Sequence, residues 1–187
     1  MRYVLTSSGQ IIRRLVRCVE LGYVHYVTGW IPEGKDPKRT DEKLIRQYGI
    51  ARSKMALLRQ FKAGRAKLRL YRFGRFFVLL ATDGDHPFFH EEWVNDIRVT
   101  PLRYNGFAIR WDGGKVRVRW SDKVYRKLRG GFVKAALKEE AKLDARLEAL
   151  RHPIYPDILR QKEAIIKAVK RRRKVAGKPR LRSYSSP

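Results

Sequence analysis

A short segment of the chain gathers the residue types that hold divalent metal ions. Five of them follow the apolar run 76–81: Asp83, Asp85, His86, His90 and Glu91. Carboxylates at the end of an interior strand can hold Mg²⁺ or Mn²⁺ for phosphodiester cleavage. One interpretation of the sequence is therefore a metal-dependent nuclease or nicking enzyme that uses the segment 83–96.

The same residues also have ordinary structural explanations. Asp83-Gly84-Asp85 is typical of a turn. Pro87 argues against a regular helix that would bring His86 and His90 together. These two histidines enclose three residues, whereas nicking enzymes of the HUH type place theirs around a single apolar residue. The leading expectation is therefore a chain with no catalytic residues and no cofactor, and the metal site is the alternative.

Net charge gives the clearest indication of a partner. The 187 residues include 44 Lys and Arg against 18 Asp and Glu, which gives a formal charge of +26. Such a chain is expected to associate with a polyanion, and each neutralised phosphate of a nucleic acid releases condensed counterions. No apolar run is long enough to span a bilayer, and no lipidation motif is present. We expect DNA or RNA as the partner, and not a membrane.

A strand predicted near residues 66–73 carries cations and aromatic rings on one face. Alternation along a strand places Lys67, Arg69, Tyr71 and Phe73 together, opposite Leu68 and Leu70. Bases can stack on rings while cations follow the phosphates, as in proteins that bind single strands. We expect these four residues, with Arg75 in the turn beyond, to contact nucleic acid. The alternative is that Tyr71 and Phe73 pack under a helix.

A second basic face is predicted on the hairpin that turns at Gly113-Gly114. The alternation places Arg110, Arg117 and Arg119 on the face opposite the apolar side chains. Like charges on paired strands weaken a sheet, so a face of this kind is expected to have a use. Phosphate contact is the use we favour, and a solvated outer face is the alternative.

The last predicted helix, from about residue 157 to 176, ends in five consecutive cations: Lys170, Arg171, Arg172, Arg173 and Lys174. Apolar residues earlier in this helix repeat at helical spacing, so one side can dock on the domain. Cations at a helix C-terminus also suit the helix dipole. A run of five exceeds what the dipole requires, and we expect these residues to contact the polyanion.

The order of elements predicts an α+β protein. We expect a mostly antiparallel sheet with helices packed on one face, followed by a helical C-terminal third. The expected domains are an α+β core (1–120), C-terminal helices packed on that core (121–176) and a basic flexible tail (177–187). The run 76–81 is the candidate central strand, and Gly130-Gly131 is expected to break or kink the helical pattern after residue 121. Cys18 is the single cysteine, so neither an internal disulfide nor a cysteine-based zinc cluster can form.

These patterns favour a non-catalytic nucleic-acid-binding protein, either free or as a subunit of a nucleoprotein complex with other protein subunits. A structural protein of a large RNA particle is a third hypothesis. The first ten residues lack the layout of a secretion signal. We therefore expect an intracellular location, in the cytoplasm or nucleoid, or in the nucleus of a eukaryote.

Overall fold

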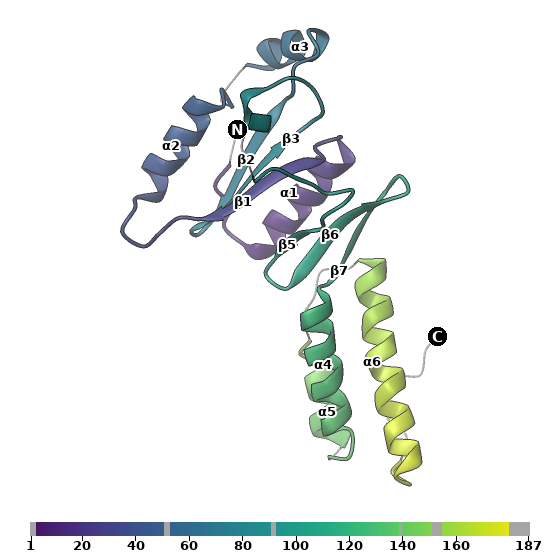
Figure 1. Ribbon diagram of the computed structural model, residues 1–187. Coiled ribbons are helices and arrows are strands. Elements are labelled where there is room, and N and C mark those ends of the chain that lie inside the picture. Colours follow the sequence, from purple (N-terminus) through teal and green to yellow (C-terminus); the bar gives the residue numbers. More distant parts are fainter. Residues whose placement is uncertain (1–2, 51–52, 91–92, 139, 151–154, 180–187) are drawn as a thin grey trace. The chain divides into compact units, whose positions relative to one another are not determined.

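The structure is a computed structural model, and it describes residues 3–50, 53–90, 93–138, 140–150 and 155–179 (Figure 1). The chain divides into two units. The first comprises residues 1–102 and 109–116, and the second comprises residues 103–108 and 117–187. The α+β class predicted from the sequence is confirmed.

A four-stranded antiparallel sheet forms the centre of the first unit. Its strands are β1 (His25–Trp30), β2 (Leu68–Phe73), β3 (Phe76–Ala81) and β4 (Asn95–Asp96), in the order β2-β3-β1-β4. Strand β3 lies between β2 and β1 and pairs with both along its whole length. This confirms the prediction of a central strand, whose continuous apolar run suits burial on two faces.

Helix α1 (Ser8–Glu20) packs on one face of β2. Ser7 caps its first turn by accepting a hydrogen bond from the backbone of Gln10. Its apolar residues recur at helical spacing and are fully buried: Ile11, Ile12, Leu15, Cys18 and Val19. The free thiol of Cys18 is part of this core, and burial raises its pKa.

The opposite face of the sheet holds a second apolar cluster. Leu68 and Leu70 of β2 pack there with Leu79 of β3, under Tyr48 and Phe88. Tyr48 follows helix α2 (Pro37–Gln47), and Phe88 lies in a short 3-10 helix, η1 (Pro87–His90). A third helix, α3 (Lys54–Lys62), precedes β2. Both faces of β2 are therefore covered.

An ion pair connects α2 to the sheet. Asp41 is fully buried and accepts two hydrogen bonds from Nε of Arg72, at 2.9 and 2.8 Å. Arg72 also donates to the carbonyl of Gly74 at 2.7 Å. A buried carboxylate requires such a partner, because an unpaired charge in the interior is strongly destabilising.

A three-stranded sheet contains β5 (Leu102–Tyr104), β6 (Phe107–Asp112) and β7 (Lys115–Trp120), in that order. The turn between β6 and β7 is Gly113-Gly114, with φ values of 54° and 88°. Two consecutive positive φ angles make the tight hairpin turn that matches strand twist, which confirms the predicted hairpin. The strands thus form two sheets, where the sequence predicted one, and the boundary between the units runs through the second.

Three helices make up most of the second unit: α4 (Asp122–Ala135), α5 (Glu140–Glu148) and α6 (Pro156–Val175). Helices α4 and α6 lie side by side (Figure 1). Helix α4 runs through both glycines to Ala135, so of the expected break or kink at Gly130-Gly131 the break does not occur. A helical glycine costs about 1 kcal/mol, and burial of Phe132 and Ala135 in the same helix offsets that cost.

Side-chain hydrogen bonds attach α6 to the end of β7. Gln161 accepts from the backbone N–H of Trp120 at 2.7 Å and donates to its carbonyl at 3.1 Å.

Within the described ranges, no helix combines the length and the apolar composition needed to cross a membrane.

Candidate nucleic-acid interface

The predicted aromatic face of β2 is not open to a ligand. Tyr71 is 2% exposed and lies on the side of the sheet that α1 covers. Its hydroxyl accepts a hydrogen bond from the Cys18 thiol, with sulfur and oxygen 3.6 Å apart. The expectation that Tyr71 stacks on a base is therefore wrong, because alternation separates the two faces of a strand without showing which is covered. Phe73 is half-buried beside the turn.

Arg69 is held inside the same face. Its Nη1 donates to the Tyr71 hydroxyl at 3.4 Å, and its guanidinium lies 5.0 Å from the centre of the Tyr23 ring. Burial opposes the charged form, but hydrogen bonding to Tyr71 and Tyr23 leaves the pKa of Arg69 raised. Two tyrosines of the protein thus hold this guanidinium, which reduces what it can offer to a phosphate.

Arg75 organises a loop. Its guanidinium donates to the carbonyls of Ile31 at 3.3 Å, Glu33 at 2.8 Å and Lys35 at 3.2 Å, and also to that of Pro32. Four carbonyl groups thus occupy its donors. The predicted phosphate contact at Arg75 is replaced by a structural role, since a guanidinium is a planar fork that suits several acceptors at once.

Lys67 has an aromatic neighbour that the sequence did not indicate. Its Nζ lies 4.3 Å from the centre of the Phe61 ring in a cation–π contact, and Phe61 is 61% exposed. Phe61 repeats with Met55 and Leu58 at helical spacing, a pattern that is typical of a buried helix face. All three are exposed in the structure. One sequence feature could have pointed to this region as a basic surface: the chain contains no Asp or Glu between Glu42 and Asp83.

The hairpin shows the expected alternation. Arg110, Arg117 and Arg119 are exposed, whereas Val118 and Trp120 are buried. Carboxylates of the helices hold two of these arginines. Arg117 Nη1 lies 3.2 Å from Asp157 of α6, and Arg119 Nη2 lies 3.4 Å from Asp122 of α4. These ion pairs reduce the charge that Arg117 and Arg119 can offer to a ligand.

The five cations at the end of α6 do not all point the same way. Arg173 is 4% exposed and points into the helical unit, where Nη1 donates to the carbonyl of Ala136 at 2.9 Å and to that of Lys138 at 3.2 Å. Its Nε donates to the carbonyl of Pro179 at 2.8 Å. Arg173 therefore satisfies carbonyls left open where α4 ends, and its predicted polyanion contact is wrong.

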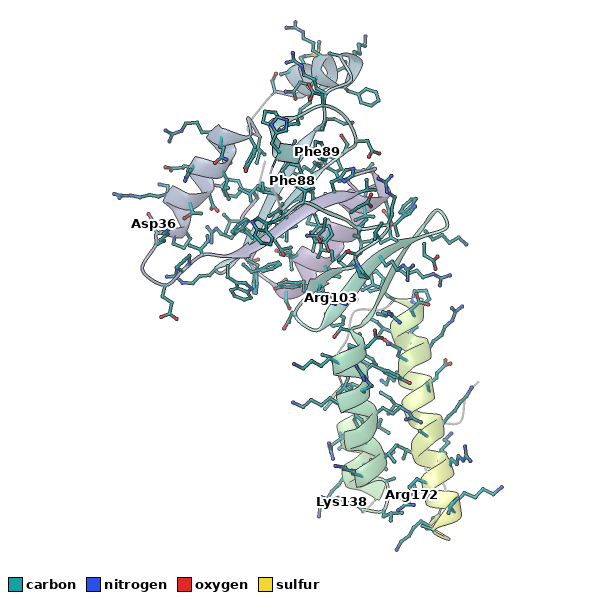
Figure 2. All side chains as sticks on the ribbon, viewed as in Figure 1. Asp36, Phe88, Phe89, Arg103, Lys138 and Arg172 are labelled. Atoms are coloured by element: carbon teal, nitrogen blue, oxygen red, sulfur yellow. The ribbon has the colours of Figure 1, made fainter. Side chains whose placement is uncertain are left out.

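The Arg173 contacts bring cations from two helices to one end of the unit. Figure 2 shows Lys138, just beyond α4, and Arg172 of α6 at this common end. We call the exposed cations there the basic tip: Lys134, Lys138, Arg171, Arg172, Lys174 and Lys178. None of the six forms an ion pair with another residue whose side chain is described.

The basic tip continues along α6. Lys167, Arg171 and Lys174 are spaced by four and three residues, so they lie on one side of the helix, and all three are exposed. The opposite side carries Ile158, Ile165 and Val169, which are fully buried. The amphipathic pattern of α6 thus directs its cations away from the helical core. Lys170, another member of the predicted run, is half-buried.

The acidic segment forms structural ion pairs. Asp83 Oδ1 lies 2.7 Å from Nε2 of His25 and 3.4 Å from Nη2 of Arg98. Arg98 also donates to both carboxylate oxygens of Asp96, which lowers the pKa of Asp96. The guanidinium of Arg98 thus occupies the position between Asp83 and Asp96 that a cation would take.

The other described members of the predicted metal site, Asp85, His86 and His90, do not form a metal-binding group. His86 Nδ1 accepts the backbone N–H of Phe88 at 3.0 Å, which fixes the start of η1. Asp85 and His90 are exposed. Glu91 lies outside the described residues. Over the described part of the chain, no three His, Cys, Asp or Glu side chains form a group that could hold a metal ion.

Charge is concentrated in the second unit. Its 77 residues contain 23 Lys and Arg and 7 Asp and Glu, so that 23 − 7 gives +16 of the total of +26. No protein-family model and no curated protein matches this chain.

Proposed function

We propose that this protein binds nucleic acid through the basic tip of its helical unit, as a non-catalytic subunit of a nucleoprotein complex. The observation that carries the proposal is the geometry at Arg173. One buried arginine fastens the end of α6 to the end of α4, and six exposed cations lie in the last turns of these helices or just beyond them. Cations held close together without carboxylate partners release counterions efficiently when they meet phosphates.

We choose between the predicted basic surfaces by asking which of their cations already contact other groups of the protein. Arg69 and Arg75 donate to groups of the protein itself, and Arg117 and Arg119 face carboxylates. An arginine that already has an ion pair gains less from a phosphate, because the existing contact must be broken. Among the residues whose side chains the structure describes, the cations of the basic tip have no such ion pair to lose.

Binding without catalysis fits the ion pairs of the acidic segment. A nuclease that used this segment would need Asp83 and its neighbours to hold a divalent ion. Arg98 neutralises Asp83 and Asp96 together. A divalent ion would have to displace a guanidinium that donates to both carboxylates, which disfavours the metal-dependent alternative. A nucleic-acid ligand also suits the intracellular location that we expect from the sequence.

The test measures affinity by fluorescence anisotropy with labelled single-stranded RNA, single-stranded DNA and duplex DNA. The full-length protein is compared with the triple variant Arg171→Ala, Arg172→Ala, Lys174→Ala. Its matched control removes three exposed cations from α2, Lys38→Ala, Arg39→Ala, Lys43→Ala, and so has the same net charge. We expect the basic-tip variant to lose at least ~10-fold in affinity and the control to lose much less.

Equal losses in the two triple variants would show that total charge, and not the basic tip, determines binding. Weak binding of the unmodified protein to all three ligands at low salt would overturn the proposal itself. The rank of the three ligands identifies the nucleic acid that the complex contains.

A further inference from the structure

A cavity of about 420 Å³ opens beside α1 in the first unit. The residues that line it are Val4, Leu5, Thr6, Gln10, Arg13, Arg14 and Arg17. Its volume lies within the range of about 300–1,000 Å³ typical of small-molecule sites. All of the lining residues belong to α1 or to the segment that precedes it.

Two sets of contacts hold the walls of the cavity in place. The segment before α1 is fixed to β2, where Leu5 N–H donates to the carbonyl of Arg72 at 2.8 Å and Arg72 N–H donates to that of Tyr3 at 2.9 Å. On the other side, α1 is fixed by its buried apolar face, which includes Ile11 and Leu15. The cavity is therefore bounded by the first strand-like segment and a rigid helix.

The charged wall contains three arginines and no carboxylate. Arg13, Arg14 and Arg17 are exposed on the side of α1 that does not face the sheet. Arg17 lies 3.3 Å from Glu20, while Arg13 and Arg14 form no ion pair with a described residue. Guanidinium groups that line one cavity can donate several charge-assisted hydrogen bonds to one anion with multiple oxygens.

The remaining walls add polar and apolar surface. Thr6 donates to Gln10 Oε1 through its backbone N–H at 3.2 Å and its hydroxyl at 3.1 Å, which directs the Gln10 side chain. The amide NH₂ of Gln10 remains a donor at the cavity, since its oxygen is the acceptor of both bonds. Val4 and Leu5 supply an apolar surface. A ligand that suits these walls carries an anion with several oxygens at one end and a less polar group at the other.

We propose that this cavity binds a nucleoside 5′-phosphate, with the phosphate at Arg13 and Arg14 and the nucleoside against Val4 and Leu5. The residues of the cavity all belong to the first unit, whereas those of the basic tip belong to the second, so the two proposals rest on different residues. Free mononucleotides and the 5′-phosphorylated end of a nucleic acid present the same chemistry. A phosphomonoester carries nearly two charges at neutral pH, which suits this cluster of arginines better than an internal phosphodiester.

The test is isothermal titration calorimetry of the full-length protein with adenosine 5′-monophosphate, adenosine and inorganic phosphate. We expect the nucleotide to bind more tightly than either fragment. The variant Arg13→Gln, Arg14→Gln is expected to weaken nucleotide binding at least ~10-fold, since it removes two charged donors. Its matched control is Lys38→Gln, Arg39→Gln on α2, which changes the charge equally and is expected to leave nucleotide affinity unchanged.

Three results would overturn the proposal: no measurable nucleotide binding, inorganic phosphate binding as tightly as the nucleotide, or equal losses in the two double variants. Both substituted arginines are exposed, so the variant is expected to fold, which circular dichroism checks.

A second arm separates the two sources of the phosphate. Oligonucleotides of one sequence are compared with a 5′-phosphate and with a 5′-hydroxyl. If the protein prefers the 5′-phosphorylated oligonucleotide and the Arg13→Gln, Arg14→Gln variant loses that preference, the cavity binds nucleic-acid ends. If the protein binds the mononucleotide but shows no preference between the two oligonucleotides, the cavity binds free nucleotides. The basic-tip triple variant separates this proposal from the proposed function, since it is expected to keep full mononucleotide affinity while losing oligonucleotide affinity.

Discussion

Neighbouring arginines in this protein have opposite roles. Arg172 and Arg173 are consecutive, yet Arg172 is exposed at the basic tip and Arg173 is buried among backbone carbonyls. A helix turns by about 100° per residue, so adjacent side chains face different surroundings. Composition therefore overstates the number of cations that can reach a ligand.

Replacement of Arg173 by Ala is expected to destabilise the protein by about 2–4 kcal/mol, because three carbonyls lose a charged donor in a buried position. The measurement is the free energy of unfolding in urea. Arg172→Ala is the matched control, and we expect it to change stability by less than about 0.5 kcal/mol. Similar values for the two variants would contradict the structural role of Arg173.

The pKa of Asp96 predicts how the segment 83–98 responds to acid. Hydrogen bonds from Arg98 lower this pKa, so the folded state holds the ionised carboxylate more tightly than the unfolded state does. The resulting stability is present above the unfolded pKa of about 3.9 and is lost as the pH falls through the folded value. We expect Asp96→Asn to be destabilising at pH 7 and to reduce the loss of stability between pH 5 and pH 3, as measured by urea unfolding. An unchanged acid dependence in Asp96→Asn would contradict this role of the ion pair.

At the scale of elements, α2 is attached to the sheet by a single buried charge pair. Asp41 lies in the middle of α2, and Arg72 lies on β2. Asp41 is the one fully buried residue of α2. The position of α2 therefore depends on this ion pair together with Leu44 and Ile45, which are half-buried against the apolar cluster of the sheet.

Replacing Arg72 by Leu is expected to cost about 3–5 kcal/mol in unfolding free energy, because it leaves a buried carboxylate without a partner. Arg46→Leu, on the exposed side of α2, serves as the control and is expected to be nearly neutral. The double variant Arg72→Leu, Asp41→Asn should recover part of the loss. If it does not, the ion pair does not account for the effect of Arg72.

At the scale of the whole molecule, charge is unevenly divided between the units. The first unit carries 21 Lys and Arg and 11 Asp and Glu, and 21 − 11 gives +10 over 110 residues, against +16 over 77 residues in the second. Self-repulsion is thus greatest in the helical unit, where counterions or phosphates lower it most. This asymmetry accords with a polyanion site on the helices.

Salt dependence gives a quantitative test at this scale. Each phosphate contact contributes about −0.9 to the slope of log K against log salt for duplex DNA, or about −0.7 for single strands. The triple variant of Arg171, Arg172 and Lys174 is therefore expected to make that slope shallower by about 2–3, as measured by anisotropy between 50 and 300 mM salt. A slope that stays the same would show that these three side chains contact no phosphates.

Local sequence patterns predicted where helices, strands and turns lie better than they predicted which side chains are buried. Ser7 and Ser53 cap the helices that follow them, and Gly113-Gly114 forms the expected hairpin turn. These features depend on a few adjacent residues, whose backbone preferences act over short distances. The predicted helix continues through Gly130-Gly131 without a break because burial of Phe132 outweighs an unfavourable local preference.

The sequence by itself determined the charge, the absence of a disulfide, the class of fold and the alternation of the hairpin. Only the tertiary structure decided which cations and rings are available to a ligand. Tyr71 is covered because Cys18, 53 residues earlier, lies against it, and Arg173 is buried because the end of α4 requires a donor. Exposure depends on contacts between residues far apart in the chain, which periodicity within one element does not record.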